Sequence, residues 1–229
     1  MGDKQPYILG LTGGLAAGKS TVCAMFRQAG ATIVDADKIV HQLQQPNTPE
    51  TQTIAEHITQ STGHNILDKT GAIDRQKLAK EISANSQWLT FVEDVLHPAV
   101  QREEKKQIQA AALAYKNTKT VAQRPQSGEV NSDGLESGGL VVLDVPLLFE
   151  VGTHHLCDST AYCHAPEAVR KQRVFAPNNG RNSMTEDKWQ TLLARRWPEA
   201  QALAAADHII NTNVDKAITK QQVTALCQQ

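Results

Sequence analysis

Aromatic residues are scarce in this chain of 229 residues, and neither sign of charge dominates it. Phe, Trp and Tyr together make up 4% of the sequence, and the formal net charge is −1 at pH 7. A balanced charge provides no general attraction for nucleic acid or for an anionic membrane surface. We therefore predict no nucleic-acid partner and no membrane partner, and we expect a monomer or a weak oligomer.

The sequence also lacks a long hydrophobic run. No stretch approaches the ~20 apolar residues of a transmembrane helix, and the opening residues MGDKQP contain no hydrophobic signal segment. Pro6 stands where a myristoylation signal has Ser or Thr. These features favour a cytoplasmic protein.

Cysteine is sparse, and none of it occurs as a C-x-x-C pair, which predicts free thiols in a reducing compartment. The four cysteines are Cys23, Cys157, Cys163 and Cys227. Two of them lie near His154, His155 and His164. A strand predicted at 160–164 would send Cys163 and His164 to opposite faces, so a surface loop is favoured here over a zinc site.

The sequence does contain a phosphate-binding loop. Residues 13–20 read GGLAAGKS and match G-x-x-x-x-G-K-[ST]. The apolar run before them predicts a buried strand at 7–11, and residues 19–30 predict a helix. In that setting, backbone N–H groups point at a di- or triphosphate, and the helix N-terminus adds partial positive charge. A chance match in a glycine-containing turn is the weaker alternative.

The loop predicts a site for a nucleoside triphosphate. Lys19 reaches the outer phosphates, and the Ser20 hydroxyl coordinates Mg²⁺. We expect the phosphates to be bound by Gly13, Gly14, Leu15, Ala16, Ala17, Gly18, Lys19, Ser20 and Thr21.

Alternating strand and helix patterns predict an α/β fold, a three-layer sandwich around a parallel sheet. Asp74 is a predicted helix N-cap, and Pro98 is predicted to begin a long helix. The mixed charges at 102–106 predict a solvated helix face. The Ser-, Gly- and Asn-rich stretch 117–139 predicts a flexible surface insertion.

Carboxylates are predicted near the loop. Asp35 and Asp37 follow the second predicted strand, at the edge where ligands bind in open α/β sheets. A carboxylate there can accept a proton from a substrate hydroxyl or help to hold Mg²⁺. Capping of the next helix is the alternative role. Asp144, at the tip of another predicted strand, is placed to hold Mg²⁺ through water.

The segment 170–196 predicts a lid. It carries seven basic residues against two acidic ones, and residues 176–183 read as a turn between two helices. A basic, hinged helix pair excludes water and brings guanidinium groups to the transferring phosphoryl group; a solvated helix pair is the alternative. Because no N-K-x-D motif for guanine is present, a small-molecule kinase is favoured over a GTPase.

Several separated motifs resemble the dephospho-CoA kinase family. They are LTGGLAAGKSTV, VDAD, LHP at 96–98, DVPLLFE at 144–150, the lid segment, and ADHIIN at 206–211. The resemblance implies a P-loop NTPase-type fold like that of nucleoside-monophosphate kinases, forming one domain over 5–227. Its implied parts are a five-stranded core (5–35, 140–169 and 206–227), a helical CoA-binding region (36–116), the insertion (117–139) and the lid (170–196).

The resemblance also implies a reaction: transfer of the γ-phosphate of ATP, with Mg²⁺, to the ribose 3′-hydroxyl of dephospho-CoA. Asp35 would be the base, Lys19 would stabilise the transferring group, and Arg181 or Arg173 would be the lid arginine on the phosphates. Acceptor-side residues would be Asp35, Asp37, His97, Pro98, Leu147, Leu148, Phe149 and Glu150.

Other implications of the resemblance concern the adenine side and the loop. Asp207 and Asn211 would lie near the adenine. GLAAGKS stands where GIGSGKS is more usual, and this should be harmless because alanine can adopt helical angles. Arg196 stands where a glutamine is common. Two alternative functions remain open: another small-molecule P-loop kinase, and a non-enzymatic ATP-binding switch.

Overall fold

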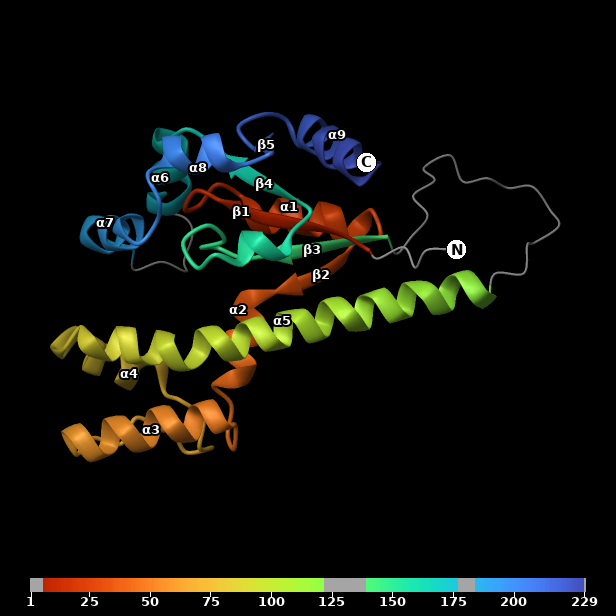
Figure 1. The fold of residues 1–229 in the computed structure, drawn as a ribbon. Helices are drawn as coiled ribbons and strands as arrows, with labels where there is room; N and C mark the ends of the chain where they lie inside the picture. The colour runs from red at the N-terminus through yellow and green to blue at the C-terminus, as the bar shows by residue number, and fades with distance from the viewer. Residues whose placement is uncertain (1–5, 122–138, 177–183, 229) are drawn as a thin grey trace. The chain divides into compact units, whose positions relative to one another are not determined.

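The computed structural model describes residues 6–121, 139–176 and 184–228 (Figure 1). The chain divides into two compact units. We call residues 1–34 and 108–229 the sheet unit, and residues 35–107 the helical unit. Most of the predicted insertion, and Arg181, lie outside the described residues. Within the described part of the chain, no helix is both long enough and apolar enough to cross a membrane.

A five-stranded parallel sheet forms the centre of the fold, as predicted from the sequence, with strand order β2-β3-β1-β4-β5. The strands are β1 (Tyr7–Gly13), β2 (Thr32–Asp35), β3 (Leu140–Asp144), β4 (Ser159–His164) and β5 (His208–Asn211). In the register of β1 with its neighbours, Leu11 pairs with Asp144 and Gly13 pairs with Cys163. The carboxyl ends of these strands therefore meet at one edge.

Helices follow the strands of the sheet unit. They are α1 (Lys19–Gln28), α6 (Glu167–Phe175), α7 (Glu186–Ala194), α8 (Glu199–Ala205) and α9 (Lys216–Cys227), with a 3₁₀ turn at Thr153–Leu156. Ala161 and Cys163 of β4 join a core cluster with α1 and α9. Tyr162, between them in sequence, packs instead with Phe149 and with Ala202 of α8. The two-residue period of β4 thus places its side chains in different clusters.

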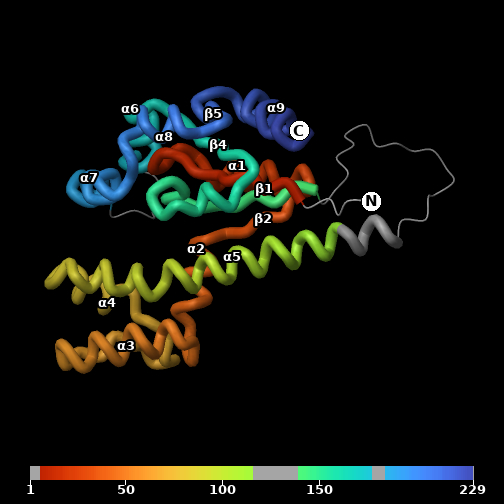
Figure 2. The backbone as a smooth tube through the Cα atoms, viewed as in Figure 1, coloured from red at the N-terminus to blue at the C-terminus, as the bar shows by residue number. Residues whose placement is uncertain are grey.

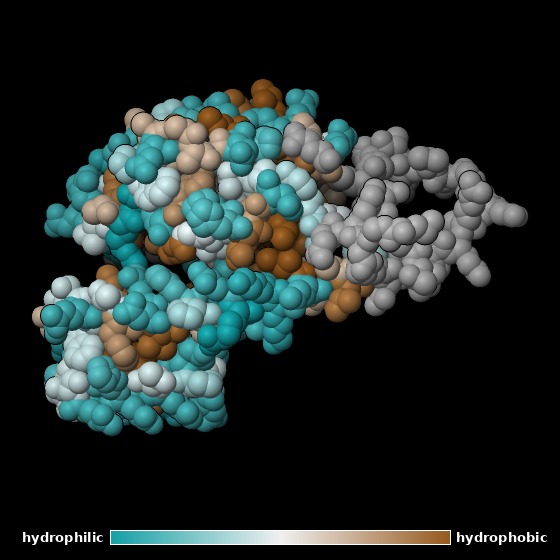
Figure 3. Space-filling view, viewed as in Figure 1, coloured by the Kyte–Doolittle hydropathy of each residue, from teal (hydrophilic) through white to brown (hydrophobic). Residues whose placement is uncertain are grey.

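The helical unit contains α2 (Ala36–Leu43), α3 (Pro49–Thr62), α4 (Arg75–Ala84) and the first part of α5 (Gln87–Val121). Asp74 accepts hydrogen bonds from the backbone N–H groups of Gln76 and Lys77, which confirms the predicted N-cap of α4. The helical unit has its own apolar core, which includes Ile54, Ile58, Ile66, Leu78 and Leu96. The face of this unit seen in Figure 3 is mostly hydrophilic, with an apolar area among the polar residues.

Helix α5 shows that one prediction was wrong. Pro98 lies inside this helix rather than at its start, and Figure 2 shows the coloured part of α5 as one continuous helical tube. An interior proline removes one backbone hydrogen bond and typically costs ~3 kcal/mol. Here Val92, Leu96 and Ala99 are all buried around it. Burial of these apolar side chains offsets the cost and keeps the helix continuous.

The charged run at 102–106 is not uniformly solvated, which corrects the prediction at one position. Lys106 and Glu103 form an exposed ion pair of 3.2 Å, but the side chain of Glu104 is buried, with a relative exposure of 1%. Neither carboxylate oxygen of Glu104 has a hydrogen-bond partner within the described part of the chain. Burial raises the pKa of this carboxyl group to about 7.

The buried Glu104 predicts a fall in stability with rising pH. A carboxyl group whose pKa is raised on folding stabilises the protein fully below its unfolded value of 4.5, and that contribution is lost as the pH rises to about 7. We expect the unfolding free energy of the wild type to fall by about 2–3 kcal/mol relative to Glu104→Gln between pH 5 and pH 8. Denaturant unfolding at several pH values measures this difference, and parallel profiles would contradict it.

Candidate active site

The phosphate loop connects β1 to α1 at the carboxyl edge of the sheet, in the setting that the sequence predicted. A Cβ atom on Gly13 would lie 2.6 Å from the Cys163 carbonyl oxygen, so only glycine fits beside β4. Gly18 adopts φ = 87°, a left-handed conformation, at the N-cap of α1. Both glycines are therefore required by the backbone itself.

Ala16 also adopts a left-handed conformation, with φ = 61°. These are not the right-handed helical angles that alanine prefers. Such a conformation costs an alanine roughly 1–2 kcal/mol, so the surrounding loop must hold it. Ala17 donates its N–H to the Gly14 carbonyl at 2.9 Å, and the Ala16 carbonyl accepts from Arg173 Nη1 at 3.5 Å.

Lys19, at the start of α1, forms an ion pair with Asp144, the last residue of β3. Their side chains have relative exposures of 20% and 10%. The pair thus lies at the carboxyl edge of two adjacent strands. Burial, together with the Asp144 carboxylate, raises the pKa of the nearby Cys23 thiol to about 12. That thiol stays protonated at neutral pH and is no candidate nucleophile.

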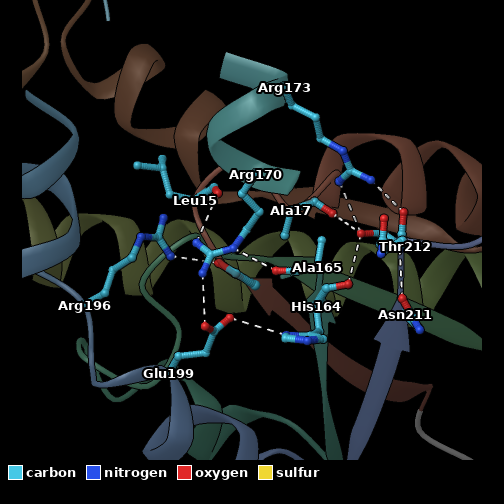
Figure 4. A network of polar contacts seen from close by, with 12 residues as sticks. Leu15, Ala17, His164, Ala165, Arg170, Arg173, Arg196, Glu199, Asn211 and Thr212 are labelled. Atoms are coloured by element: carbon cyan, nitrogen blue, oxygen red, sulfur yellow. Dashed lines mark hydrogen bonds and ion pairs between the residues drawn. The ribbon is translucent and has the colours of Figure 1, made fainter. Parts of the chain in front are cut away.

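Three arginines of the predicted lid contact carbonyl oxygens of the phosphate loop (Figure 4). Arg196 Nη1 donates to the Gly13 oxygen at 2.9 Å and to the Pro146 oxygen at 2.8 Å. Arg170 Nη1 donates to Leu15 at 3.4 Å, and Arg173 donates to Ala16. The guanidinium groups at the two ends of the lid segment therefore lie against the carbonyl side of the loop.

Arg170 is fixed from several sides. It has a relative exposure of 3%, and its Nε donates to the Ala165 carbonyl at 2.9 Å. Its Nη2 donates to Glu199 Oε2 at 3.0 Å, and the other oxygen of Glu199 lies 3.3 Å from Nδ1 of His164. The indole of Trp189 lies against it, with the guanidinium carbon 6.0 Å from the ring centroid. This arginine is built into the body of the sheet unit.

Two cavities border the loop. One of about 330 Å³ lies beside the start of α1. It is lined by Gly18, Thr21, Val22, Met25, Arg173, Thr212, Val214, Lys216 and Thr219. The other, of about 440 Å³, adjoins Gly14 and Leu15, and its wall includes Arg170, Arg196 and Trp197.

The predicted acceptor-side residues of 147–150 pack within the sheet unit. Leu148 is fully buried. Phe149 stacks on Trp197 with ring centroids 5.5 Å apart, and Glu150 accepts a hydrogen bond of 2.7 Å from the Trp197 backbone N–H. Phe149 and Glu150 also line the 440 Å³ cavity. Leu147 is half-buried.

The remaining predicted acceptor residues belong to the helical unit. Asp35 ends β2 and caps α2, accepting from the Lys38 N–H at 3.1 Å. Asp37 lies in the first turn of α2. His97 and Pro98 are exposed on α5. Asp35 therefore caps α2, which was the alternative role. Capping does not prevent the same carboxylate from also accepting a proton from a substrate hydroxyl.

One implied role is wrong, and one residue was missed. Asp207 directly precedes β5. Its carboxylate accepts hydrogen bonds from the N–H and the hydroxyl of Thr160, both at 2.8 Å. It lies at the amino ends of the strands, opposite the loop, and so cannot lie beside a nucleotide there. Thr212, just after β5, is not among the predicted site residues, yet its hydroxyl contacts the Ala17 carbonyl of the loop. No local pattern marks it.

Among the described residues, no group of three or more His, Cys, Asp or Glu side chains is arranged to hold a metal ion. Cys163 is buried in the core while His164 is half-buried on the other face, as the strand alternation predicted. All four cysteines are free thiols.

A parallel sheet with this loop between its first strand and first helix defines a P-loop nucleoside-triphosphate-binding protein. A family model described as dephospho-CoA kinase matches residues 7–126. The dephospho-CoA kinase of Enterococcus faecalis is 32% identical over 94% of this chain and 93% of its own. That of Bartonella quintana is 34% identical over 96% of both chains. The chain belongs to the dephospho-CoA kinase family.

Solved structures show the same fold. The crystal structure of TT1252 from Thermus thermophilus superposes with a TM-score of 0.67, at 23% identity, covering 98% of this chain and 97% of the other. Dephospho-CoA kinase from Campylobacter jejuni superposes with a TM-score of 0.60, at 19% identity, covering 96% and 95%. At these identities the similarity establishes the fold class.

The Arg170–Glu199 pair gives a stability prediction. Glu199→Ala leaves the buried guanidinium without its carboxylate, and we expect a loss of about 1–3 kcal/mol in unfolding free energy. The matched control is Glu186→Ala, which removes the exposed partner of Lys171 and should change stability little. Denaturant unfolding measures the loss of unfolding free energy in each variant; equal losses would show that Glu199 stabilises the buried guanidinium no more than Glu186 stabilises the exposed Lys171.

Proposed function

We propose that this protein is an ATP-dependent kinase that phosphorylates the ribose 3′-hydroxyl of dephospho-CoA, forming coenzyme A. The observation that carries the proposal is the phosphate loop, with Lys19 paired to Asp144 at the carboxyl edge of the sheet, in a chain related over nearly its whole length to dephospho-CoA kinases. The loop identifies the phosphate donor as a nucleotide, and the family identifies the acceptor.

The ATP site is proposed along the loop and in the 330 Å³ cavity beside it. The carbonyl side of the loop faces arginine and threonine donors, which leaves the opposite side for phosphate oxygens. Gly18 and Thr21 connect the loop to that cavity, which would receive the nucleoside. Lys19 would leave Asp144 for the outer phosphates. Arg173, in the cavity wall, is the described arginine that we propose to meet the nucleotide; Arg181 is the other proposed lid arginine.

Mg²⁺ is proposed at the start of α1. Ser20 is exposed there, and Asp144 supplies a carboxylate at the neighbouring strand end. Hydroxyl and carboxylate oxygens are the ligands that Mg²⁺ prefers, with phosphates and waters completing its shell. When bound, the ion neutralises charge on the β- and γ-phosphates.

We propose that Asp35 accepts the proton of the acceptor hydroxyl in the transfer step. The acceptor oxygen forms a bond to the γ-phosphorus while the bond from that phosphorus to the β–γ bridging oxygen breaks, and ADP leaves. The hydroxyl proton passes to the carboxylate of Asp35, at the carboxyl end of β2. We propose that the acceptor is bound by Asp37, His97, Pro98 and the loop 147–150.

A direct assay tests the proposed function. Purified protein with ATP, Mg²⁺ and dephospho-CoA should release ADP at a rate that depends on dephospho-CoA. A Lys19→Met variant, purified in the same way, controls for contaminating kinases. It lacks the ammonium group proposed to reach the outer phosphates, so ADP release in this preparation would come from a contaminant. ADP release with other alcohol acceptors, but not with dephospho-CoA, would indicate another small-molecule kinase. ATP binding without transfer to any acceptor would indicate a switch.

The role of Asp35 is tested by a substitution that preserves its cap. Asparagine caps helices about as well as aspartate but cannot accept the proton. We therefore expect Asp35→Asn to keep its melting temperature and its affinity for ATP while kcat falls about 10²–10⁴-fold. Asp35→Ala should lose stability as well, by about 1 kcal/mol. A near-normal kcat for Asp35→Asn would leave Asp35 only its capping role.

A further inference from the structure

The carbonyl oxygen of Ala17 lies in the peptide unit that leads into Gly18, the N-cap residue of α1. The backbone N–H of Gly18 belongs to the same peptide unit. No described peptide bond is cis, so this planar unit holds its C=O and N–H in opposite directions. Whatever fixes the direction of the Ala17 oxygen therefore also fixes the direction of the Gly18 N–H.

The Ala17 oxygen is held by the side chain of Thr212. The Thr212 hydroxyl lies within hydrogen-bond distance of two carbonyl oxygens, those of Ala17 and His164. The Ala17 oxygen is the closer of the two. The His164 oxygen already accepts the Thr212 backbone N–H at 2.9 Å. The hydroxyl of Thr212 has a single proton to donate, and we assign that hydrogen bond to the Ala17 oxygen.

Thr212 is itself fixed at both of its backbone polar groups. Its N–H extends the pairing of β5 with β4 through His164. Its carbonyl accepts Arg173 Nη2 at 2.7 Å. The Thr212 side chain is therefore presented to the loop by contacts of its backbone with β4 and with Arg173 of α6 (Figure 4).

We propose that Thr212 is a positioning residue, whose hydroxyl turns the Ala17–Gly18 peptide so that the Gly18 N–H faces the phosphates of the nucleotide. This rests on the proposed ATP site. Thr212 acts on the phosphates through the loop and not by contacting them. Since Thr212 also lines the 330 Å³ cavity, a direct effect on the nucleoside is the competing explanation, and the experiment separates the two.

The test compares Thr212→Val, which keeps the shape but loses the hydroxyl, with Thr212→Ser, which keeps the hydroxyl. Affinities for ADP and for adenosine are measured by displacement of a fluorescent ADP analogue. We expect Thr212→Val to weaken ADP binding about 5- to 10-fold, as for the loss of one net hydrogen bond, and to leave adenosine binding unchanged. Thr212→Ser should bind ADP within about 2-fold of the wild type.

Three results would overturn the proposal: unchanged ADP affinity in Thr212→Val, equal weakening of adenosine and ADP, or the same defect in Thr212→Ser as in Thr212→Val. Should Thr212→Val not fold, Thr212→Ala replaces it with the same expectations. In turnover, KM for ATP should rise in Thr212→Val with kcat little changed.

The binding measurement is independent of the proposed acceptor. A wild-type protein that binds ADP but phosphorylates no dephospho-CoA would contradict the proposed function and leave the Thr212 proposal standing. Normal turnover of dephospho-CoA by Thr212→Val, with unchanged ADP affinity, would contradict the Thr212 proposal and leave the proposed function standing.

Discussion

The direction of the peptide groups in the phosphate loop is the constraint on which the site depends. A loop can bind phosphate through its N–H groups only if its carbonyl oxygens are satisfied elsewhere, because buried polar groups without partners are costly. In this chain the partners come from residues more than a hundred positions later. Arg170 and Arg196 reach the loop from the lid segment, and Thr212 reaches it from the end of β5.

This dependence explains why the lid segment is partly built into the sheet unit. Arg170 is buried and held by Glu199, so the start of α6 is part of the support of the loop. Arg196 stands where the resemblance leads one to expect a glutamine, and its guanidinium joins the carbonyls of Gly13 and Pro146. Arg170 and Arg196 thus support the loop, whereas Arg173 both contacts the Ala16 carbonyl and is proposed to meet the nucleotide.

The sequence predicted the features that local pattern encodes. The parallel sheet, the loop and the cap at Asp74 follow from short-range periodicity, glycine placement and capping chemistry. What it could not predict depends on distant contacts. Pro98 lies inside a helix because buried neighbours offset its cost, Glu104 is buried within a charged run, and Asp207 is used to join two strands. Thr212 has no motif, because its role depends on where β5 ends.

The identity of the phosphorylated product shows whether the loop and its supports serve the phosphorylation of dephospho-CoA. Protein incubated with ATP, Mg²⁺ and dephospho-CoA would be analysed by ³¹P NMR and mass spectrometry. We expect one new phosphomonoester, on the ribose 3′-oxygen, with ADP formed in equal amount. A phosphate on another hydroxyl, or ADP formed without a phosphorylated acceptor, would contradict it.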